Sequence, residues 1–200
     1  MCSKKLLKRY IEQEERLMIL YKNVDICDLD SIFKKGILSM DECGNDNWDE
    51  GKRDDNDTSV VYLFDPIDEI NTFPKSYGAA LLEVDCDASE TEISQKDAHQ
   101  KHYKEYITKE VLPNQIKRVI IPRIFKKRIE DELSKKIQIR WCEIEAEYYN
   151  EKDKRVKCKD EVLRQFAKTA PIKDTGYFNY FRGTTEKNTI IDLYNIKYIF

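Results

Sequence analysis

The feature that most constrains the fold is a short apolar run, Tyr77 to Cys86 (YGAALLEVDC), in which Glu83 is the first charge. Such a run is typical of a strand buried on both faces of a sheet. Two other segments also have strand composition: Ser59 to Phe64 (SVVYLF) and Ile116 to Pro122 (IKRVIIP), the latter closed by proline. A sheet with buried central strands is therefore predicted to organise the chain.

Helical spacing of apolar residues marks segments on both sides of these strands. Residues 4–20 predict an amphipathic opening helix. Asp28 to Leu38 predicts a brief helix that Asp28 caps and Gly36 ends. The same spacing recurs in Ile124 to Leu133 and Asp160 to Ala170.

The remaining segments are less regular. Residues 41–59 are polar and acidic, which predicts a surface loop with Trp48 as its one residue suited to packing. Residues 90–98 fit either a helix or a loop. Ile137, Ile139 and Trp141 alternate with polar residues and predict another strand, and the tail 190–200 is apolar and aromatic.

Strands and helices follow one another without a strict βαβα rhythm, which favours an α+β fold over a doubly wound sheet. Two hundred residues suffice for one domain with a sizeable core. We therefore expect a single domain over residues 1–200, consisting of an N-terminal helix (1–18), a core (19–122) and a C-terminal α/β extension (123–200).

Charge and cysteine content exclude several classes of function. The net charge is -3, from 35 basic and 38 acidic residues. This charge does not indicate a protein that binds nucleic acid over its whole surface, but it is compatible with a local basic groove. The six cysteines are scattered without the spacing of a zinc site, so no metal is expected. The charged start predicts no signal peptide, and no run approaches the roughly 20 apolar residues of a membrane span. A cytoplasmic protein with free thiols is expected.

Familiar catalytic signatures such as GxGxxG, a Walker loop, HExxH and GxSxG do not occur. His99 and His102 fit a metal or acid–base pair or, without a third ligand, solvated surface residues. Arg182, between aromatic residues and a Gly-Thr turn, fits either a phosphate contact or a surface turn.

The most specific signal is a set of segments in a fixed order. Leu20 to Val24 (LYKNV) precedes the predicted helix from Asp28. Val61 to Asp65 (VYLFD) precedes the apolar run with Ala80 to Val84 (ALLEV), and Lys104 to Thr108 (KEYIT) precedes the strand at Ile116. Each segment is short, and their order and spacing carry more information than any one of them.

These segments resemble the motifs of the ADP-ribosyltransferase superfamily, in the branch of poly-ADP-ribose polymerases and diphtheria-type toxins. LYKNV is similar to that branch's LWHGS-like strand, VYLFD to its IYFAD-like strand, ALLEV to its LLGEV-like strand and KEYIT to its EYIVY-like strand. Ile26 to Leu38 is also similar to a strand-to-helix pattern of bacterial toxins that ADP-ribosylate DNA. The resemblance covers about residues 19–122.

The resemblance implies a split β-sheet core and NAD as co-substrate. It implies that Glu105 is the catalytic carboxylate and that Tyr21, Lys22 and Asn23 contact NAD. Lys22-Asn23 stands where the family carries His-Gly, which hold the ribose and the nicotinamide amide. Tyr62 or Tyr77 is expected to stack on the nicotinamide.

The chemistry of the reaction agrees with a carboxylate at this position. Cleavage of the nicotinamide–ribose bond passes through an oxocarbenium-like sugar, and a fixed carboxylate stabilises the developing positive charge. Transfer of ADP-ribose to a protein or nucleic-acid acceptor is the expected activity. The alternative for Glu105 itself is a solvated charge at a strand start. Separately, the departure from the family at Lys22-Asn23 leads to a second hypothesis, a degenerate transferase-like scaffold that binds a protein or nucleic acid. For a nucleic-acid acceptor, Lys117-Arg118 and Lys126-Lys127-Arg128 are the candidate phosphate contacts.

Overall fold

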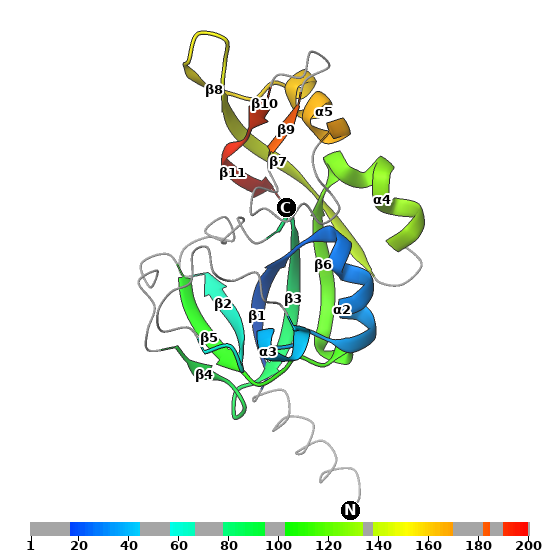
Figure 1. Ribbon diagram of the computed structural model, residues 1–200, viewed down its shortest axis with the longest axis vertical. Coiled ribbons are helices and arrows are strands. Elements are labelled where there is room, and N and C mark those ends of the chain that lie inside the picture. Colours follow the sequence, from blue (N-terminus) through cyan, green and yellow to red (C-terminus); the bar gives the residue numbers. More distant parts are fainter. Residues whose placement is uncertain are drawn as a thin grey trace, which may run out of the picture.

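We describe the protein from a computed structural model that covers residues 17–44, 57–66, 78–94, 103–133, 138–169, 182–184 and 190–199. Within these residues the main sheet has nine strands in the order β11-β7-β6-β3-β1-β2-β5-β4, with β8 also pairing with β7 (Figure 1). Its strands are β1 (Leu17–Val24), β2 (Val61–Pro66), β3 (Ala80–Asp87), β4 (Glu92–Ile93), β5 (Tyr103–Thr108), β6 (Ile116–Pro122), β7 (Ile139–Tyr149), β8 (Arg155–Lys157) and β11 (Tyr194–Ile199). A separate pair consists of β9 (Arg182–Thr184) and β10 (Ile190–Asp192).

All strand pairs of the main sheet are antiparallel except β6 and β7, which run parallel. The connection between these two strands passes through the 3-10 turn η6 (Arg123–Phe125) and helix α4 (Lys126–Leu133). A parallel pair needs such a crossover, whereas antiparallel neighbours do not. The mixture of a largely antiparallel sheet with few helices confirms the α+β class.

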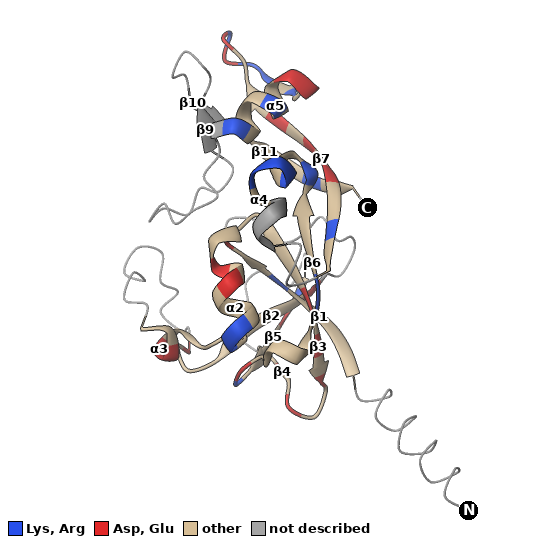
Figure 2. Cartoon of the chain, turned by 90° about the vertical axis from the view of Figure 1, so that its right-hand side faces the viewer, with Lys and Arg blue, Asp and Glu red and all other residues tan. Residues whose placement is uncertain are grey.

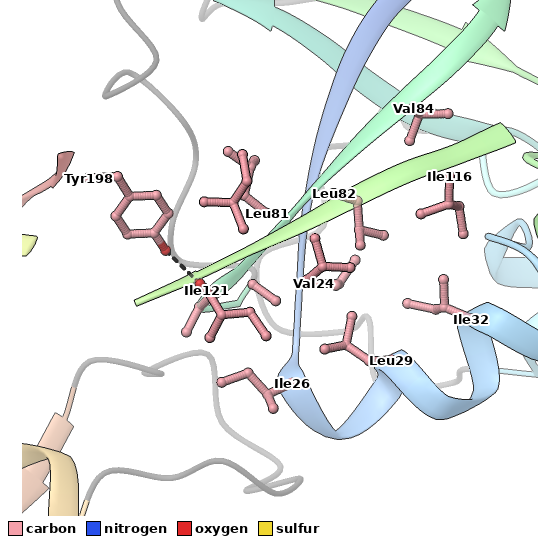
Figure 3. Close-up of a cluster of buried hydrophobic side chains, with 14 of the residues drawn as sticks. Val24, Ile26, Leu29, Ile32, Leu81, Leu82, Val84, Ile116, Ile121 and Tyr198 are labelled. Carbon is pink, nitrogen blue, oxygen red and sulfur yellow. Dashed lines mark hydrogen bonds between the residues drawn. The ribbon is translucent and has the colours of Figure 1, made fainter. Parts of the chain in front are cut away.

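The core lies where β1, β3 and β6 are covered by helix α2 (Leu29–Lys35). Figure 3 shows the buried side chains of Leu29 and Ile32 facing those of Val24, Leu82 and the other strand residues. Leu82 is fully buried, as the uninterrupted apolar run of β3 requires of a strand covered on both faces. Burial of each such side chain stabilises the fold by about 1.5–3 kcal/mol.

Two glycines allow backbone segments to approach closely in this core. Gly36 ends α2 with φ +86°, and a Cβ there would overlap the Val111 carbonyl oxygen. Gly78 has φ +146°, and a Cβ there would overlap the Val24 carbonyl oxygen. Both conformations lie in the region that favours glycine, and the missing side chain also leaves room for the facing strand or loop.

The main sheet divides into two parts between β1 and β2. Strand β1 pairs with β3 from Leu17 to Val24, whereas its pairing with β2 consists of the single pair Tyr21 and Phe64. Strand β2 in turn pairs with β5 along its whole length, from Val61 to Pro66. The part formed by β2, β5 and β4 is therefore joined to the rest of the sheet by one residue pair, which we call the β1–β2 junction.

The C-terminal region extends the sheet beyond β6 through β7, β8 and β11, with helix α5 (Asp160–Thr169) beside them (Figure 1). Ala146 and Ile144 of β7 are buried, and the intervening Glu145 is exposed, so one face of β7 packs and the other meets solvent. Acidic segments recur along this strand in Figure 2. In addition to the β6–β7 pairing, Tyr198 of β11 joins this region to the core, since its hydroxyl donates a hydrogen bond to the Ala79 carbonyl oxygen.

Several boundaries differ from the sequence prediction. Residues 17–20 belong to β1, although they were expected to form the end of a helix over 4–20. Residues 17 and 18 therefore do not belong to the N-terminal helix expected over 1–18, and residues 1–16 lie outside the described residues. Residues 17–20 pair with β3, so tertiary pairing overrides the local helical spacing. Asp28 makes no side-chain capping bond, because Asp25 instead accepts from Cys27 N and starts the 3-10 turn η1 (Ile26–Asp28) that precedes α2.

Other differences concern segments that were expected to be loops or short strands. The loop predicted over 41–59 begins inside helix α3 (Met40–Cys43), where Ser39 and Glu42 form a capping box. Trp48 lies outside the described residues. Within 90–98 the two-residue strand β4 forms. The strand expected from Ile137, Ile139 and Trp141, ahead of the charged stretch near residue 150, is β7, which begins at Ile139 and ends at Tyr149.

Strand β2 begins and ends two residues later than the predicted 59–64, and β3 begins at Ala80 instead of 77, whereas several other elements agree with the prediction. Strand β6 spans Ile116–Pro122 as expected, and α2 ends at Gly36. Helices α4 and α5 lie where helical spacing placed them. The 3-10 turn η5 (Pro113–Gln115) links β5 to β6.

Candidate active site

A row of side chains crosses one face of the main sheet at the β1–β2 junction. Directly opposed residues in antiparallel strands share a face. Glu83 of β3 is opposite Tyr21 of β1, Tyr21 is opposite Phe64 of β2, and Phe64 is opposite Glu105 of β5. These residues form what we call the buried row, since Glu83, Phe64 and Glu105 are each buried and Tyr21 is half-buried.

Glu105 is held inside a strand and not at its exposed start. It is the third residue of β5, only 6% exposed, and its backbone carbonyl accepts a hydrogen bond from Ser94 N at 2.9 Å. Phe64 beside it packs against Tyr103, with ring centroids 5.5 Å apart. A carboxylate kept in such an aromatic, buried setting is costly unless it is compensated or used. The interpretation of Glu105 as a solvated charge is therefore wrong.

Asn23 and Tyr62 lie on the same face as the buried row, on either side of the junction. Each is two residues along its strand from Tyr21 or Phe64, so strand periodicity gives them the same orientation. The hydroxyl of Tyr62 accepts a hydrogen bond from Asp57 N at 2.8 Å. The side chains of Tyr21, Asn23, Tyr62 and Glu105, all named from the sequence, thus share one face.

The Asn23 side chain has one partner and one unused acceptor. It is 3% exposed, and its Nδ2 donates to the Gly78 carbonyl oxygen at 3.1 Å. Its Oδ1 is buried and has no hydrogen-bond partner in the described part of the chain. Native proteins leave few buried acceptors unsatisfied, so this atom is a candidate ligand contact.

Lys22 points to the opposite face, because adjacent residues of a strand alternate. Its Nζ donates to the Tyr62 carbonyl oxygen at 3.0 Å and so bridges β1 and β2 where their regular pairing is limited to one pair. Burial lowers the pKa of the Lys22 ammonium to about 8, while the nearby Glu105 and, to a smaller extent, Cys43 act to raise it. Lys22 is therefore separated from the shared face but is still influenced by Glu105.

The far end of the buried row carries an ion pair. Arg118 Nε donates to Glu83 Oε2 at 2.8 Å, and Arg118 is directly opposite Glu83. Burial raises the pKa of the Tyr21 hydroxyl, and the neighbouring Glu83 carboxylate raises it further. Lys117 next to Arg118 pairs with Asp85 at 2.6 Å. The basic pair expected to contact phosphate is therefore already engaged by carboxylates.

The second basic cluster is also partly engaged within the protein. Lys126 Nζ lies 5.8 Å from the centre of the Trp141 ring, and Arg128 donates to the Ala167 carbonyl oxygen at 2.8 Å. Lys127 is exposed.

Some of the residues singled out from the sequence are not placed. Tyr77, His99 and His102 lie outside the described residues, as does the side chain of Arg182. Among the described residues no group of His, Cys, Asp or Glu side chains is arranged to hold a metal ion. The helices of the described ranges are all too short or too polar to cross a bilayer.

Sequence reasoning missed Glu83 and Phe64 as members of the buried row. A signal for Glu83 existed, since a carboxylate within the apolar run ALLEV has to be paired or used when that strand is buried. Phe64 and the unused acceptor of Asn23 depend on cross-strand register, which one sequence does not reveal. Comparison with family models, with curated proteins and with solved structures found no match to the chain.

Proposed function

We propose that this protein binds NAD at the shared face of β1, β2 and β5 and transfers its ADP-ribose to a macromolecular acceptor. The proposal combines the resemblance of LYKNV, VYLFD and KEYIT with one observation that carries it. That observation is the common orientation of Tyr21, Asn23, Tyr62 and Glu105 around the β1–β2 junction.

The residues on this face suit the nicotinamide part of the co-substrate. Asn23 Oδ1 is a buried acceptor without a donor, and a carboxamide N–H supplies one. Tyr62 and Tyr21 offer aromatic surfaces for a flat ring. Burial strengthens each polar contact, since few waters compete with the ligand.

Glu105 is suited to the chemical step. Bond cleavage between ribose C1′ and the nicotinamide nitrogen leaves the electron pair on nicotinamide and positive charge on the sugar. The Glu105 carboxylate stabilises that charge, and the acceptor's nucleophilic atom then bonds to C1′ as its proton passes to a base. An interaction made mainly in the transition state lowers the barrier without tightening ground-state binding.

The test compares two buried glutamates of the same row. Purified protein is incubated with labelled NAD and cell lysate, and protein and nucleic acid are separated afterwards. Glu105→Gln should lower the rate of label transfer by about 100-fold or more. Glu83→Gln, equally buried but paired with Arg118, should retain transfer if the folded fraction is matched. Equal rates for wild type and Glu105→Gln would eliminate the proposal.

A second candidate is a transferase-like scaffold that binds a macromolecule without catalysis. The orientation of Lys22 favours it, because the residue at the family's histidine position is bonded to Tyr62 O on the other face. Release of free nicotinamide from NAD, even slowly, distinguishes the two candidates. A scaffold without activity should release none above a buffer control.

A further inference from the structure

We propose that the C-terminal strand β11 sets the orientation of the Asn23 side chain, through the Tyr198 hydroxyl and the backbone of Gly78 and Ala79. Asn23 Oδ1 is thereby reserved for an N–H donor of a bound ligand. Tyr198 is a positioning residue in this proposal, and the ligand's chemical class is a primary carboxamide. The identification of that carboxamide with nicotinamide rests on the proposed function.

Tyr198 connects the C-terminal region to the start of β3. It is 1% exposed, and its hydroxyl donates to the Ala79 carbonyl oxygen at 2.7 Å, a buried contact between residues 119 positions apart. Figure 3 shows its ring reaching toward the strands of the core beside Leu81. Leu81 is the cross-strand partner of Asn23, so Tyr198 approaches the sheet beside the residue pair that contains Asn23.

Gly78 connects this contact to Asn23. Its carbonyl oxygen accepts from Asn23 Nδ2 at 3.1 Å, and it directly precedes Ala79. Its Cα lies so close to the Val24 carbonyl that a side chain there would overlap it. The Gly78–Ala79 segment thus lies close to the Val24 backbone, and its two carbonyl oxygens are bonded by Asn23 and Tyr198.

The Gly78–Ala79 segment decides which atom of the Asn23 amide is available. With Nδ2 donating to Gly78 O, a flip of the amide would place Oδ1 against another carbonyl oxygen, which is repulsive. Oδ1 therefore stays an acceptor in a buried position without a partner. A ligand N–H satisfies it, whereas a ligand carboxylate at the same place adds acceptor to acceptor and leaves both unsatisfied.

The first experiment uses the dinucleotide pair NAD and its deamido analogue, in which a carboxylate replaces the carboxamide. Calorimetric titration of wild type should give an affinity for NAD at least about tenfold higher than for the analogue. In Tyr198→Phe this ratio should fall toward one, because the ring is retained and only the hydroxyl is lost. Tyr148→Phe is the matched control, since Tyr148 is half-buried in the same region and its hydroxyl makes no hydrogen bond in the described part of the chain.

A second measurement does not depend on any ligand. The side-chain amide signal of Asn23 is assigned in an NMR spectrum of the full chain by its loss in Asn23→Leu. Tyr198→Phe should shift this signal, and Tyr148→Phe should not. If Tyr198→Phe does not fold, 3-fluorotyrosine placed at position 198 alone keeps the ring, alters the hydroxyl bond and should also shift the signal.

The outcomes separate this proposal from the proposed function. If wild type binds neither dinucleotide but Tyr198→Phe shifts the Asn23 amide signal, the NAD function fails and the positioning by Tyr198 stands. An unchanged amide signal together with an unchanged affinity ratio in folded Tyr198→Phe overturns the positioning, whatever the activity of the protein.

Discussion

Glutamate side chains gather in two regions of the sheet, and the two groups differ in how far they are exposed to solvent. In the buried row, Glu83 and Glu105 are each 6% exposed and lie among aromatic and aliphatic neighbours. On β7, the side chains of Glu143 and Glu145 are 62% and 49% exposed and pair with Arg123 and Lys157. These two β7 residues form what we call the exposed row.

The difference teaches that the residue type alone says little about function. Exposed ion pairs contribute little, because water screens both charges and two long side chains lose freedom. A buried carboxylate carries a desolvation cost, which charged partners and hydrogen-bond donors offset. Glu83 has Arg118 as its partner, and Glu105 lies at the other end of the row opposite Phe64, equally buried.

The largest expected effect concerns the backbone that supports the buried row. Gly78→Ala should lower the free energy of unfolding by about 4 kcal/mol, since Ala must adopt φ +146° and overlap the Val24 carbonyl. Gly44→Ala is the control: φ is +60° there but nothing lies within 4 Å, and a loss of about 1 kcal/mol is expected. Urea unfolding measures both, and equal losses would contradict the close approach at Gly78.

The next effect concerns Lys22, whose folded pKa of about 8 lies below the ordinary value of 10.5. The unfolded chain then binds more protons between these values, so stability rises with pH across this window. Relative to Lys22→Met, wild type should gain about 3 kcal/mol from pH 8 to 10.5. Because both proteins contain the same tyrosines and cysteines, the titration of these groups cancels in the difference between the two unfolding free energies.

Lys104 supplies the control for this pH dependence. It lies on the same face as Lys22 by strand register but is exposed. Unfolding of Lys104→Met is measured over the same pH range, so that the general effect of replacing a lysine by methionine can be subtracted. If the difference in unfolding free energy between wild type and Lys22→Met did not change from pH 8 to 10.5, Lys22 would not be held in a desolvated position.

The smallest expected loss of stability comes from removing one ion pair in each row, which compares the two rows directly. Glu83→Gln should cost about 2 kcal/mol, less than a fully buried pair, because the Arg118 side chain is 40% exposed and partly solvated. Glu145→Gln, in the exposed row, should leave the unfolding midpoint unchanged within error. Denaturation at low and at high salt measures both, and a larger loss for Glu145→Gln would reverse the comparison.

Local features of the fold were predictable because they depend on near neighbours in the sequence. Ile116–Pro122 forms β6 as its composition indicates, and Gly36 ends α2 because that position needs a positive φ. Residues 17–20 were not predictable in this way. Their apolar spacing fits a helix locally, but pairing with Val84 to Asp87 of β3 makes them a strand.

The candidate site shows the same division. The sequence by itself determined which residue types are available: a glutamate in KEYIT, an asparagine in LYKNV and tyrosines in both LYKNV and VYLFD. Only the tertiary structure decided that Tyr21 is opposite Phe64, that Phe64 is opposite Glu105, and that Lys22 faces the other way. Register, burial and the Tyr198 contact join residues distant in the chain, and these long-range contacts are selected by packing of the whole sheet.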